Sequence, residues 1–437
     1  MNVHRLPSTV HRLAVLAIGT SVLFTGLQVL ADEKPAEEIT AANWTKAVGF
    51  APDLAAGADY EAAQGLDASN WKKAAAWIPD SLALLVEKFG LKLRTAGYRP
   101  IHPSTGYVRA TRLNRGKARV EDTGKSIRKK GIGGYVAGLP FPGPQNALEV
   151  AWNYHFNYLG DDGGLHFGVF WIGAERGVHR EEEWRWKYIS RAMHRTDIAP
   201  LPEIAAFARR DIQYASLASA SRPYDKAGTT ALFYRFEEPR DQRGYIYIPN
   251  MRRTLKLVFG TPGAPWNKTD MLNEDVRGYG GYPEWSHWKL VGRRTIVAPM
   301  HANVLTGKDN AGLTFDFETA PHWNPSMDWE PRPVYVVEAK SKFWTSPYGK
   351  MVLYVDAETF YIPLKEAWDK KGRLWKVFIN AYNESPDMDT TPPPLALTLA
   401  VDVIKEHATA IPTYGVFSNA GLKSTQFTET ANRKGGR

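Results

Sequence analysis

The chain has 437 residues, of which 43% are hydrophobic and 23% charged, a balance that is typical of globular proteins and excludes disordered or collagen-like chains. It has no cysteine, which excludes disulfides, cysteine-ligated metal centres, thiol nucleophiles and a lipidated N-terminal cysteine. The formal net charge is +9, and 15 Trp, 20 Tyr and 18 Phe residues supply a large aromatic surface that must be buried.

The N-terminus is typical of an exported protein. Residues 1–12 carry Arg5 and Arg12 and no acid, residues 13–30 are mostly apolar, and Val29 and Ala31 place small residues at a cleavage site. We expect a signal peptide over residues 1–31, a single domain over residues 32–437, and delivery to the periplasm. The alternative is a retained membrane anchor. No second segment approaches the roughly 18 apolar residues that cross a bilayer.

Residues 39–99 are predicted to be mainly helical. Thr40 is a candidate N-cap for a helix that contains Trp44, and Ser81–Phe89 is an apolar helical stretch that ends at Gly90. Residues 98–138 have the composition of a loop, rich in Gly, Arg and Lys.

A basic segment lies within that predicted loop, over residues 109–130. After removal of residues 1–31 the chain keeps a formal charge of +7, and this segment accounts for all of it. It could contact an anionic membrane surface or an acidic partner, whereas nucleic acid is not an expected partner of an exported protein. A solvated loop without a binding role is the favoured interpretation. The nine cationic residues are Arg109, Arg112, Arg115, Lys117, Arg119, Lys125, Arg128, Lys129 and Lys130.

A further helix is predicted after the rigid turn at residues 140–144. Pro144 would occupy its first position, and Leu148, Trp152, His155 and Leu159 would form one stripe along it.

Strands dominate the rest of the chain. Alternating aromatic and β-branched residues predict nine of them, and turn-like sequences at residues 249–253, 356–359 and 369–372 suggest hairpins. Within the first strand, Phe167, Val169 and Trp171 would share one face, and Phe170 and Ile172 the other. The pattern predicts a large, strongly curved antiparallel sheet. The predicted strands cover residues 165–172, 184–189, 231–237, 245–248, 254–259, 334–338, 351–355, 360–362 and 374–379.

Several separated phrases, in the same order, carry a family resemblance. They cover residues 133–142, 147–153, 288–299, 336–339, 354–356 and 372–376. Over about residues 39–430 the sequence resembles domain-of-unknown-function family 1329, a secreted proteobacterial family whose fold is similar to that of the LolA and LolB lipoprotein carriers. The resemblance implies a mainly β fold with helices (α+β), in which an incomplete antiparallel β-barrel holds an apolar cavity under a helical lid. It brings no catalytic residues.

Groups that could perform chemistry are few. His155 and His166 flank Asp161 and Asp162 and could collect a metal ion, but ordinary polar groups at a barrel rim are the favoured interpretation. The acidic run Glu181–Glu183 beside Trp184 could suggest glycosidase carboxylates, but a solvated charge run is favoured. No nucleophile elbow or nucleotide-binding loop is present, so we predict no catalytic residue, metal or cofactor.

The favoured interpretation is therefore a non-enzymatic periplasmic carrier or binding protein for a lipid, a lipoprotein or another hydrophobic ligand. An envelope transporter or an outer-membrane protein is the candidate delivery partner. One alternative is a secreted hydrolase acting on carbohydrate or lipid, and another is a structural partner of an envelope export complex. The predicted ligand-binding residues are Phe141, Leu148, Trp152, Phe156, Phe167, Trp171 and Trp288.

Overall fold

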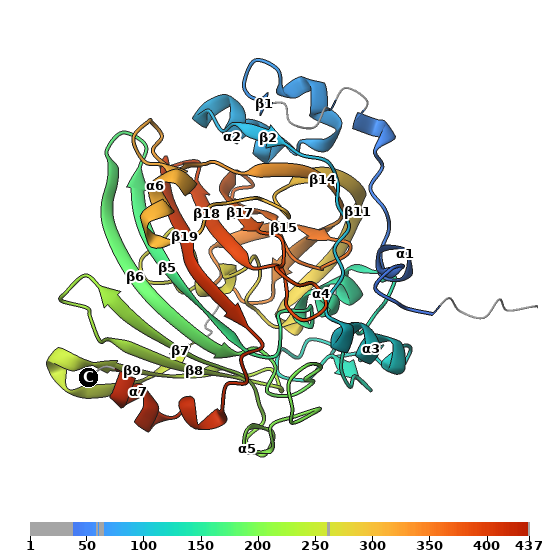
Figure 1. Ribbon diagram of the computed structural model, residues 1–437, viewed down its shortest axis with the longest axis vertical. Coiled ribbons are helices and arrows are strands. Elements are labelled where there is room, and N and C mark those ends of the chain that lie inside the picture. The colour runs from blue at the N-terminus through green and yellow to red at the C-terminus, as the bar shows by residue number, and fades with distance from the viewer. Residues whose placement is uncertain (1–37, 58–59, 61–64, 260–262, 436–437) are drawn as a thin grey trace, which may run out of the picture. The chain divides into compact units, whose positions relative to one another are not determined.

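The computed structural model describes residues 38–57, 60, 65–259 and 263–435. The predicted signal peptide and its cleavage site lie outside these residues. Most strands join one 15-stranded sheet, whose hydrogen-bonded order is β1-β2-β14-β15-β16-β17-β18-β19-β5-β6-β7-β8-β9-β10, with β11 added beside β14. The long strands pair with one another antiparallel, the short strand β2 pairs with β14 in parallel, and Figure 1 shows how strongly the sheet curves.

The sheet is an incomplete barrel. In the described part of the chain, β10 pairs only with β9, and β11 pairs only with β14, so these two strands remain as open edges. The prediction of a mainly β fold with an incomplete barrel is confirmed. The long strands are β5 (Gly163–Gly173), β6 (Gly177–Ile189), β7 (Ile212–Arg222), β8 (Thr230–Phe236), β9 (Gln242–Ile248), β10 (Arg253–Phe259), β11 (Ser286–Ala298), β14 (Asp328–Ser341), β15 (Tyr348–Asp356), β16 (Leu364–Asp369), β17 (Leu374–Tyr382), β18 (Leu395–Asp402) and β19 (His407–Ser418).

Short elements surround this sheet. The helices are α1 (Trp44–Val48), α2 (Asp80–Phe89), α3 (Thr105–Asn114), α4 (Ala147–His155), α5 (Ala205–Ala208), α6 (Ala311–Thr314) and α7 (Glu429–Gly435). The 3-10 turns are η1 (Ala55–Gly57), η2 (Trp71–Trp77), η3 (Pro249–Met251), η4 (Asn273–Asp275), η5 (Pro283–Trp285), η6 (Lys308–Asn310) and η7 (Ser424–Gln426). The short strands are β1 (Gly65–Leu66), β2 (Leu93–Thr95), β3 (Arg119–Val120), β4 (Ile132–Gly133), β12 (Phe315–Asp316) and β13 (Asn324–Pro325).

Eight of the nine predicted strands lie in β5, β6, β8, β9, β10, β14, β15 and β17. The prediction at residues 360–362 was wrong because Phe360 has a left-handed backbone (φ 55°), which ends the β15–β16 turn and cannot extend a strand. The predicted turns at 249–253 and 369–372 join β9 to β10 and β16 to β17, and Gly372 has the left-handed φ of 79° that its turn requires.

Three helical predictions need correction. The first helix begins at Trp44 with Asn43 as its N-cap position, and Thr40 instead hydrogen-bonds the Asn43 side chain. Residues 105–114, predicted as loop, form α3, because the Ser104 hydroxyl accepts from the Tyr107 N–H at 3.1 Å. Likewise Asn146, whose side chain accepts from Glu149 N, starts α4 later than Pro144.

The two faces of the sheet bury different side chains, as alternation requires. Val169 and Trp171 join an interior cluster with Phe378 and Ala400, whereas Phe170 and Ile172 belong to an outer cluster that also includes the apolar face of α2. The predicted division of this strand between two faces is confirmed. In the β14–β19 half, the interior is therefore a packed core.

Candidate ligand-binding site

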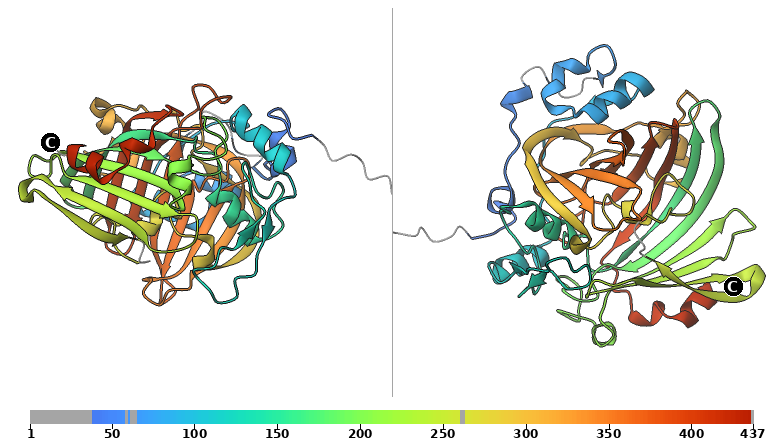
Figure 2. Two further views of the ribbon diagram at one scale, coloured as in Figure 1. Left: turned by 90° about the horizontal axis from the view of Figure 1, so that it is seen from below. Right: turned by 180° about the vertical axis from the view of Figure 1, so that it is seen from behind.

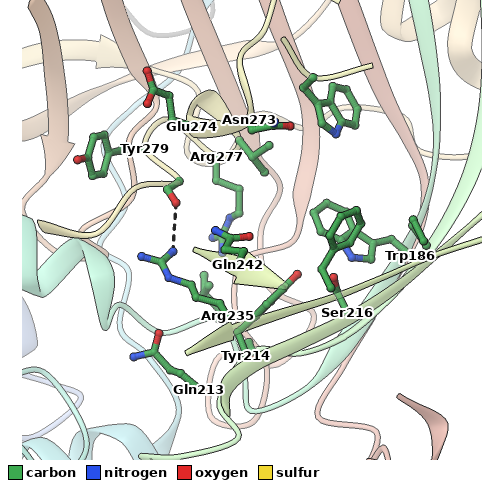
Figure 3. A pocket seen from close by; sticks show the side chains of 18 of the residues that line it. Trp186, Gln213, Tyr214, Ser216, Arg235, Gln242, Asn273, Glu274, Arg277 and Tyr279 are labelled. Carbon is green, nitrogen blue, oxygen red and sulfur yellow. Dashed lines mark hydrogen bonds between the residues drawn. The ribbon is translucent and has the colours of Figure 1, made fainter. Parts of the chain in front are cut away.

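The other half of the interior is not filled. A cavity of about 440 Å³ lies between the inner face of β5–β9 and residues 265–285, which we term the cover segment (Figure 3). Its volume is within the range of small-molecule sites. The lining aromatic side chains are Tyr154, Phe167, Trp184, Trp186, Tyr214, Phe233, Trp266, Tyr279 and Trp285.

Strand alternation explains why the lining side chains of the strands point inward. In β8, Ala231, Phe233 and Arg235 line the cavity, while Leu232 and Tyr234 lie on the opposite face. That outer face packs against Phe427 and neighbouring residues of the C-terminal segment, and Figure 2 shows α7 along β8 and β9. The sheet is thus supported from behind and can present one face to the cavity.

The cover segment is fixed to the barrel interior by buried polar contacts. Lys365 of β16 forms an ion pair with Asp275, and both side chains are fully buried. The Tyr348 hydroxyl donates to the same carboxylate at 2.7 Å. The indole of Trp171 donates to the Lys268 carbonyl at 2.9 Å, and the Tyr154 hydroxyl donates to the Arg277 carbonyl at 3.1 Å. These contacts hold an irregular segment in one place above the sheet.

A second attachment joins the cover segment to β6 through Glu182. Its buried carboxylate accepts from Asn267 Nδ2 at 2.8 Å and from the Trp184 indole at 2.9 Å, and it contacts Lys226 and Arg180. Burial alone would raise the pKa of Glu182, but these donors hold it below its ordinary value. The predicted solvated charge run was therefore wrong for Glu182 and Glu183, which are both buried.

One end of the cavity is polar and cationic. Arg191, Arg235 and Arg277 contribute to the lining together with His155, Gln213 and Gln242. Burial, with Arg235 and Arg191 beside it, lowers the pKa of His155 well below its ordinary value, so this imidazole is neutral. Glu274 is the carboxylate of the lining, and burial together with Asp275 raises its pKa to about 7.

Of the ligand-binding residues predicted from the sequence, Phe167 lines the cavity. Phe141, Leu148, Trp152 and Phe156 come together elsewhere, around Ile132, in a small cluster in which the rings of Trp152 and Phe156 stack at 5.7 Å.

The remaining two predicted residues, Trp171 and Trp288, pack with the interior cluster outside the cavity lining. The polar lining was missed by sequence reasoning. The available signal was Arg235, a charged residue on the same face as Ala231 and Phe233 of an otherwise apolar strand.

The basic segment, residues 109–130, comprises the C-terminal half of α3, the short strand β3 and the loops beside it. Eight of its nine cationic side chains are exposed, and Lys130 is half-buried against Glu237 at 2.5 Å. Arg112 contacts Glu38, and Arg119 contacts Glu121 at 2.8 Å. Most of the segment therefore presents positive charge to solvent.

The suggested metal-binding residues serve structural roles. Asp161 accepts hydrogen bonds from the N–H groups of Thr196, Asp197 and Ile198, and Asp162 accepts from those of Ala420 and Leu422. Over the described ranges, no group of three or more His, Asp or Glu side chains is placed to hold a metal ion. Within the same ranges no helix is long and apolar enough to cross a membrane.

The model of a family of proteins of unknown function, DUF1329, matches residues 66–430. The chain belongs to this family. An uncharacterized protein of Pseudomonas aeruginosa is 24% identical to this DUF1329 protein over 256 residues, which are 56% of this chain and 53% of the relative. The chain thus matches about half the length of that curated relative.

Solved structures include similar proteins. A domain described as an outer membrane lipoprotein-sorting protein, from Vibrio parahaemolyticus, is 15% identical to this DUF1329 protein, with a TM-score of 0.46 over 66% of this chain and 98% of that one. A DUF1329 family protein from Desulfovibrio piger is 16% identical, with a TM-score of 0.44 over 65% and 96% of the two chains. A LolA superfamily protein from Nitrosomonas europaea is 15% identical, with a TM-score of 0.38 over 66% and 100%.

Proposed function

We propose that this protein is a non-enzymatic periplasmic carrier or binding protein, which holds a hydrophobic ligand in the cavity beneath the cover segment. The single observation that carries the proposal is the aromatic lining of a cavity of about 440 Å³ inside an otherwise packed sheet. Each methylene group removed from water contributes roughly 0.8 kcal/mol, so an acyl chain would be retained without covalent chemistry. Membership of DUF1329, for which the sequence resemblance implies a LolA-like carrier fold, agrees with this role.

The acidic residues beside the cavity do not favour the hydrolase alternative. Glu182 and Glu183 are neighbours in β6, so their side chains point to opposite faces of the sheet. Glu182 is bound by Lys226 and Asn267, and Glu183 by His166 and Lys308. A glycosidase pair requires two carboxyl groups facing one cleft.

Native mass spectrometry of protein purified from the periplasm of its own organism tests the carrier proposal. A co-purified lipid or acylated peptide is expected, and it should be displaced by an added fatty acid. The same preparation should begin at Asp32, as the proposed cleavage after Ala31 requires. Protein that carries no ligand and takes up no hydrophobic probe would contradict the carrier role, and a retained Met1 on a membrane-bound chain would contradict the export proposal.

Delivery would need a receiving surface. The basic segment, residues 109–130, is exposed and positively charged, and we propose that it contacts anionic lipid head groups or an acidic surface of an envelope transporter or outer-membrane protein.

A further inference from the structure

The cationic end of the cavity contains guanidinium groups without a negative partner. Among the described residues, no carboxylate oxygen lies within 4.0 Å of the guanidinium nitrogens of Arg191, Arg235 or Arg277. Glu274 is the carboxylate of the lining, and it too lacks such a pair with a described cation. A charge in a cavity of low polarity is costly unless it is neutralised, so this arrangement needs an explanation.

Arg191 has a structural role. Its guanidinium donates to the carbonyl groups of Ser190, His155 and Asn157, at 2.7 to 3.2 Å, and it is largely buried. It therefore fixes the turn after α4 and has few donors left for a ligand.

Arg235 is only partly satisfied. It donates to the carbonyls of Gly280 and Gly281 at 3.2 and 2.7 Å, which aims the guanidinium from β8 towards the cover segment (Figure 3). Its Nε is buried without a hydrogen-bond partner. His155 Nδ1, at 3.4 Å from Nη2, belongs to a neutral ring and supplies no charge.

Arg277 approaches from the opposite side, on the cover segment. Its side chain extends towards Gln242 of β9 in Figure 3 and lies 5.4 Å from the ring of Tyr361. The aromatic groups around it are neutral, because burial raises the pKa of Tyr382 to about 12 and that of Tyr361 higher still. Arg277 also has a left-handed backbone (φ 58°), a conformation that favours Gly or Asn.

The two guanidinium groups act on the same part of the cavity. Both lower the pKa of the Tyr154 and Tyr214 hydroxyls, in opposition to burial, which raises it. Tyr154 and Tyr214 line the cavity beside them. Arg235 and Arg277 thus place positive charge at one end of an aromatic cavity, from two different elements.

We propose that the ligand is an anionic amphiphile, whose carboxylate or phosphate head group lies between Arg235 and Arg277 and whose hydrocarbon chain lies against Phe167, Trp186 and Phe233. This deepens the proposed carrier function and rests on it. Guanidinium groups form strong, paired hydrogen bonds with both carboxylates and phosphates, so the shared chemistry is a head group with one or two negative charges on oxygen atoms.

Competition against a fluorescent fatty acid, with the full chain, tests the proposal. Dodecanoate and dodecyl phosphate should displace the probe at concentrations at least tenfold lower than dodecanol, which has the chain without the charge. Dodecylamine should compete more weakly than dodecanol. Inorganic phosphate, which has the charge without the chain, should compete at least a hundredfold more weakly than dodecyl phosphate. The ranking of dodecanoate against dodecyl phosphate identifies the preferred head group.

Variants then assign the effect to the two arginines. Arg235→Gln and Arg277→Gln should each reduce dodecanoate affinity about tenfold and leave dodecanol affinity within about twofold, whereas Arg277→Lys should restore much of the loss. Arg253→Gln, an exposed arginine on β10, is the matched control and should change neither affinity. Because Arg235 also binds two carbonyls, the Arg277 variants and the wild-type ranking decide the matter if Arg235→Gln does not fold.

The two proposals fail in different ways. If the wild type binds dodecanol as tightly as dodecanoate, or if Arg277→Gln weakens both equally, the anionic head group is excluded and the carrier role stands. Saturable binding of inorganic phosphate as tight as that of dodecyl phosphate would also overturn the amphiphile. If the folded wild type binds none of the chain-containing probes, the carrier role itself fails.

Discussion

Lys365 and Asp275 form an ion pair in which neither side chain has any exposed surface, and this pair joins β16 to the cover segment. Tyr348 and the N–H of Leu272 bind the other oxygen of the same carboxylate. One of the attachments that hold the cover segment in place is therefore a lysine from the opposite half of the barrel.

Removal of this lysine should be strongly destabilising. In Lys365→Met, the buried Asp275 carboxylate loses its counter-charge, and we expect the free energy of unfolding in urea to fall by about 3–5 kcal/mol. In Lys340→Met, the matched control, an exposed lysine that lies 3.5 Å from Glu338 is lost, and the change should be below about 1 kcal/mol. Adding Asp275→Asn to Lys365→Met should recover part of the stability. If Lys365→Met and Lys340→Met lower the free energy of unfolding by similar amounts, the buried-pair interpretation is contradicted.

Trp152 and Trp186 should respond in opposite ways to truncation. Trp152 is 2% exposed, packs on Phe156 and lies outside the cavity lining, so Trp152→Ala should cost about 3–5 kcal/mol and leave probe affinity nearly unchanged in the folded fraction. Trp186 is half-buried and lines the cavity, so Trp186→Ala should alter probe affinity at a smaller cost in stability. Urea unfolding and fatty-acid titration of both variants provide the comparison. Equal effects on binding would place Trp152 in the site.

Glu274 should make stability depend on pH. Burial and the neighbouring Asp275 raise its pKa from 4.5 to about 7, and Lys365 opposes this only in part. Between these two values the folded state binds more protons than the unfolded state, so this group makes the free energy of unfolding fall as pH rises from about 4.5 to 7, by about 3 kcal/mol in all.

The contribution of Glu274 can be isolated with Glu274→Gln. At each pH, the free energy of unfolding of this variant in urea is subtracted from that of the wild type. The subtraction cancels the contributions of the other titrating groups. The difference in the free energy of unfolding should fall through pH 5–7 and become level above about pH 8. A difference that does not change over this range would contradict the raised pKa.

The basic segment should bind anionic vesicles. Near such a surface each Lys or Arg contributes about 1 kcal/mol, and salt screens the attraction. Arg128→Glu with Lys129→Glu should therefore weaken flotation with anionic vesicles markedly at low salt. Lys130 is left unchanged because it binds Glu237. Arg252→Glu with Arg253→Glu, at the β9–β10 turn, makes the same change of charge elsewhere and should have little effect. If both double variants lose the same amount of vesicle binding, the basic segment acts only through the net charge of the protein.

The sequence predicted the sheet well because strands carry their own pattern. Alternation divided Phe167, Val169 and Trp171 from Phe170 and Ile172, and the structure has the same division. The long strands that were missed are β7, β11, β16, β18 and β19; of these, β7 is rich in Ala and Ser, and β19 contains Pro412. Small side chains and a proline remove the aromatic and β-branched signal on which strand prediction depends.

The cavity was harder to predict, since the cover segment has no periodic pattern of hydrophobic residues. Nothing in the local sequence of residues 265–285 shows that Asp275 reaches Lys365 or that Arg277 approaches β9. Those contacts join residues far apart in the chain. Aromatic residues in general were expected to bind the ligand. The cover segment determines which of them pack together and which line the cavity.

The pairing of β5 with β19 has a consequence for how the chain folds. Gly173 lies opposite His407, and Gly163 opposite Ser418, so one side of β5 receives its hydrogen-bond partners only from the C-terminal part of the chain. Successive addition of hairpins from the N-terminus would leave that edge of β5 unpaired until residue 418 has been synthesised. Contacts of such sequence separation slow folding, and an unpaired edge invites association with other chains. A chaperone that keeps the nascent chain apart from other copies should therefore raise the yield of folded protein and leave the stability of the folded product unchanged.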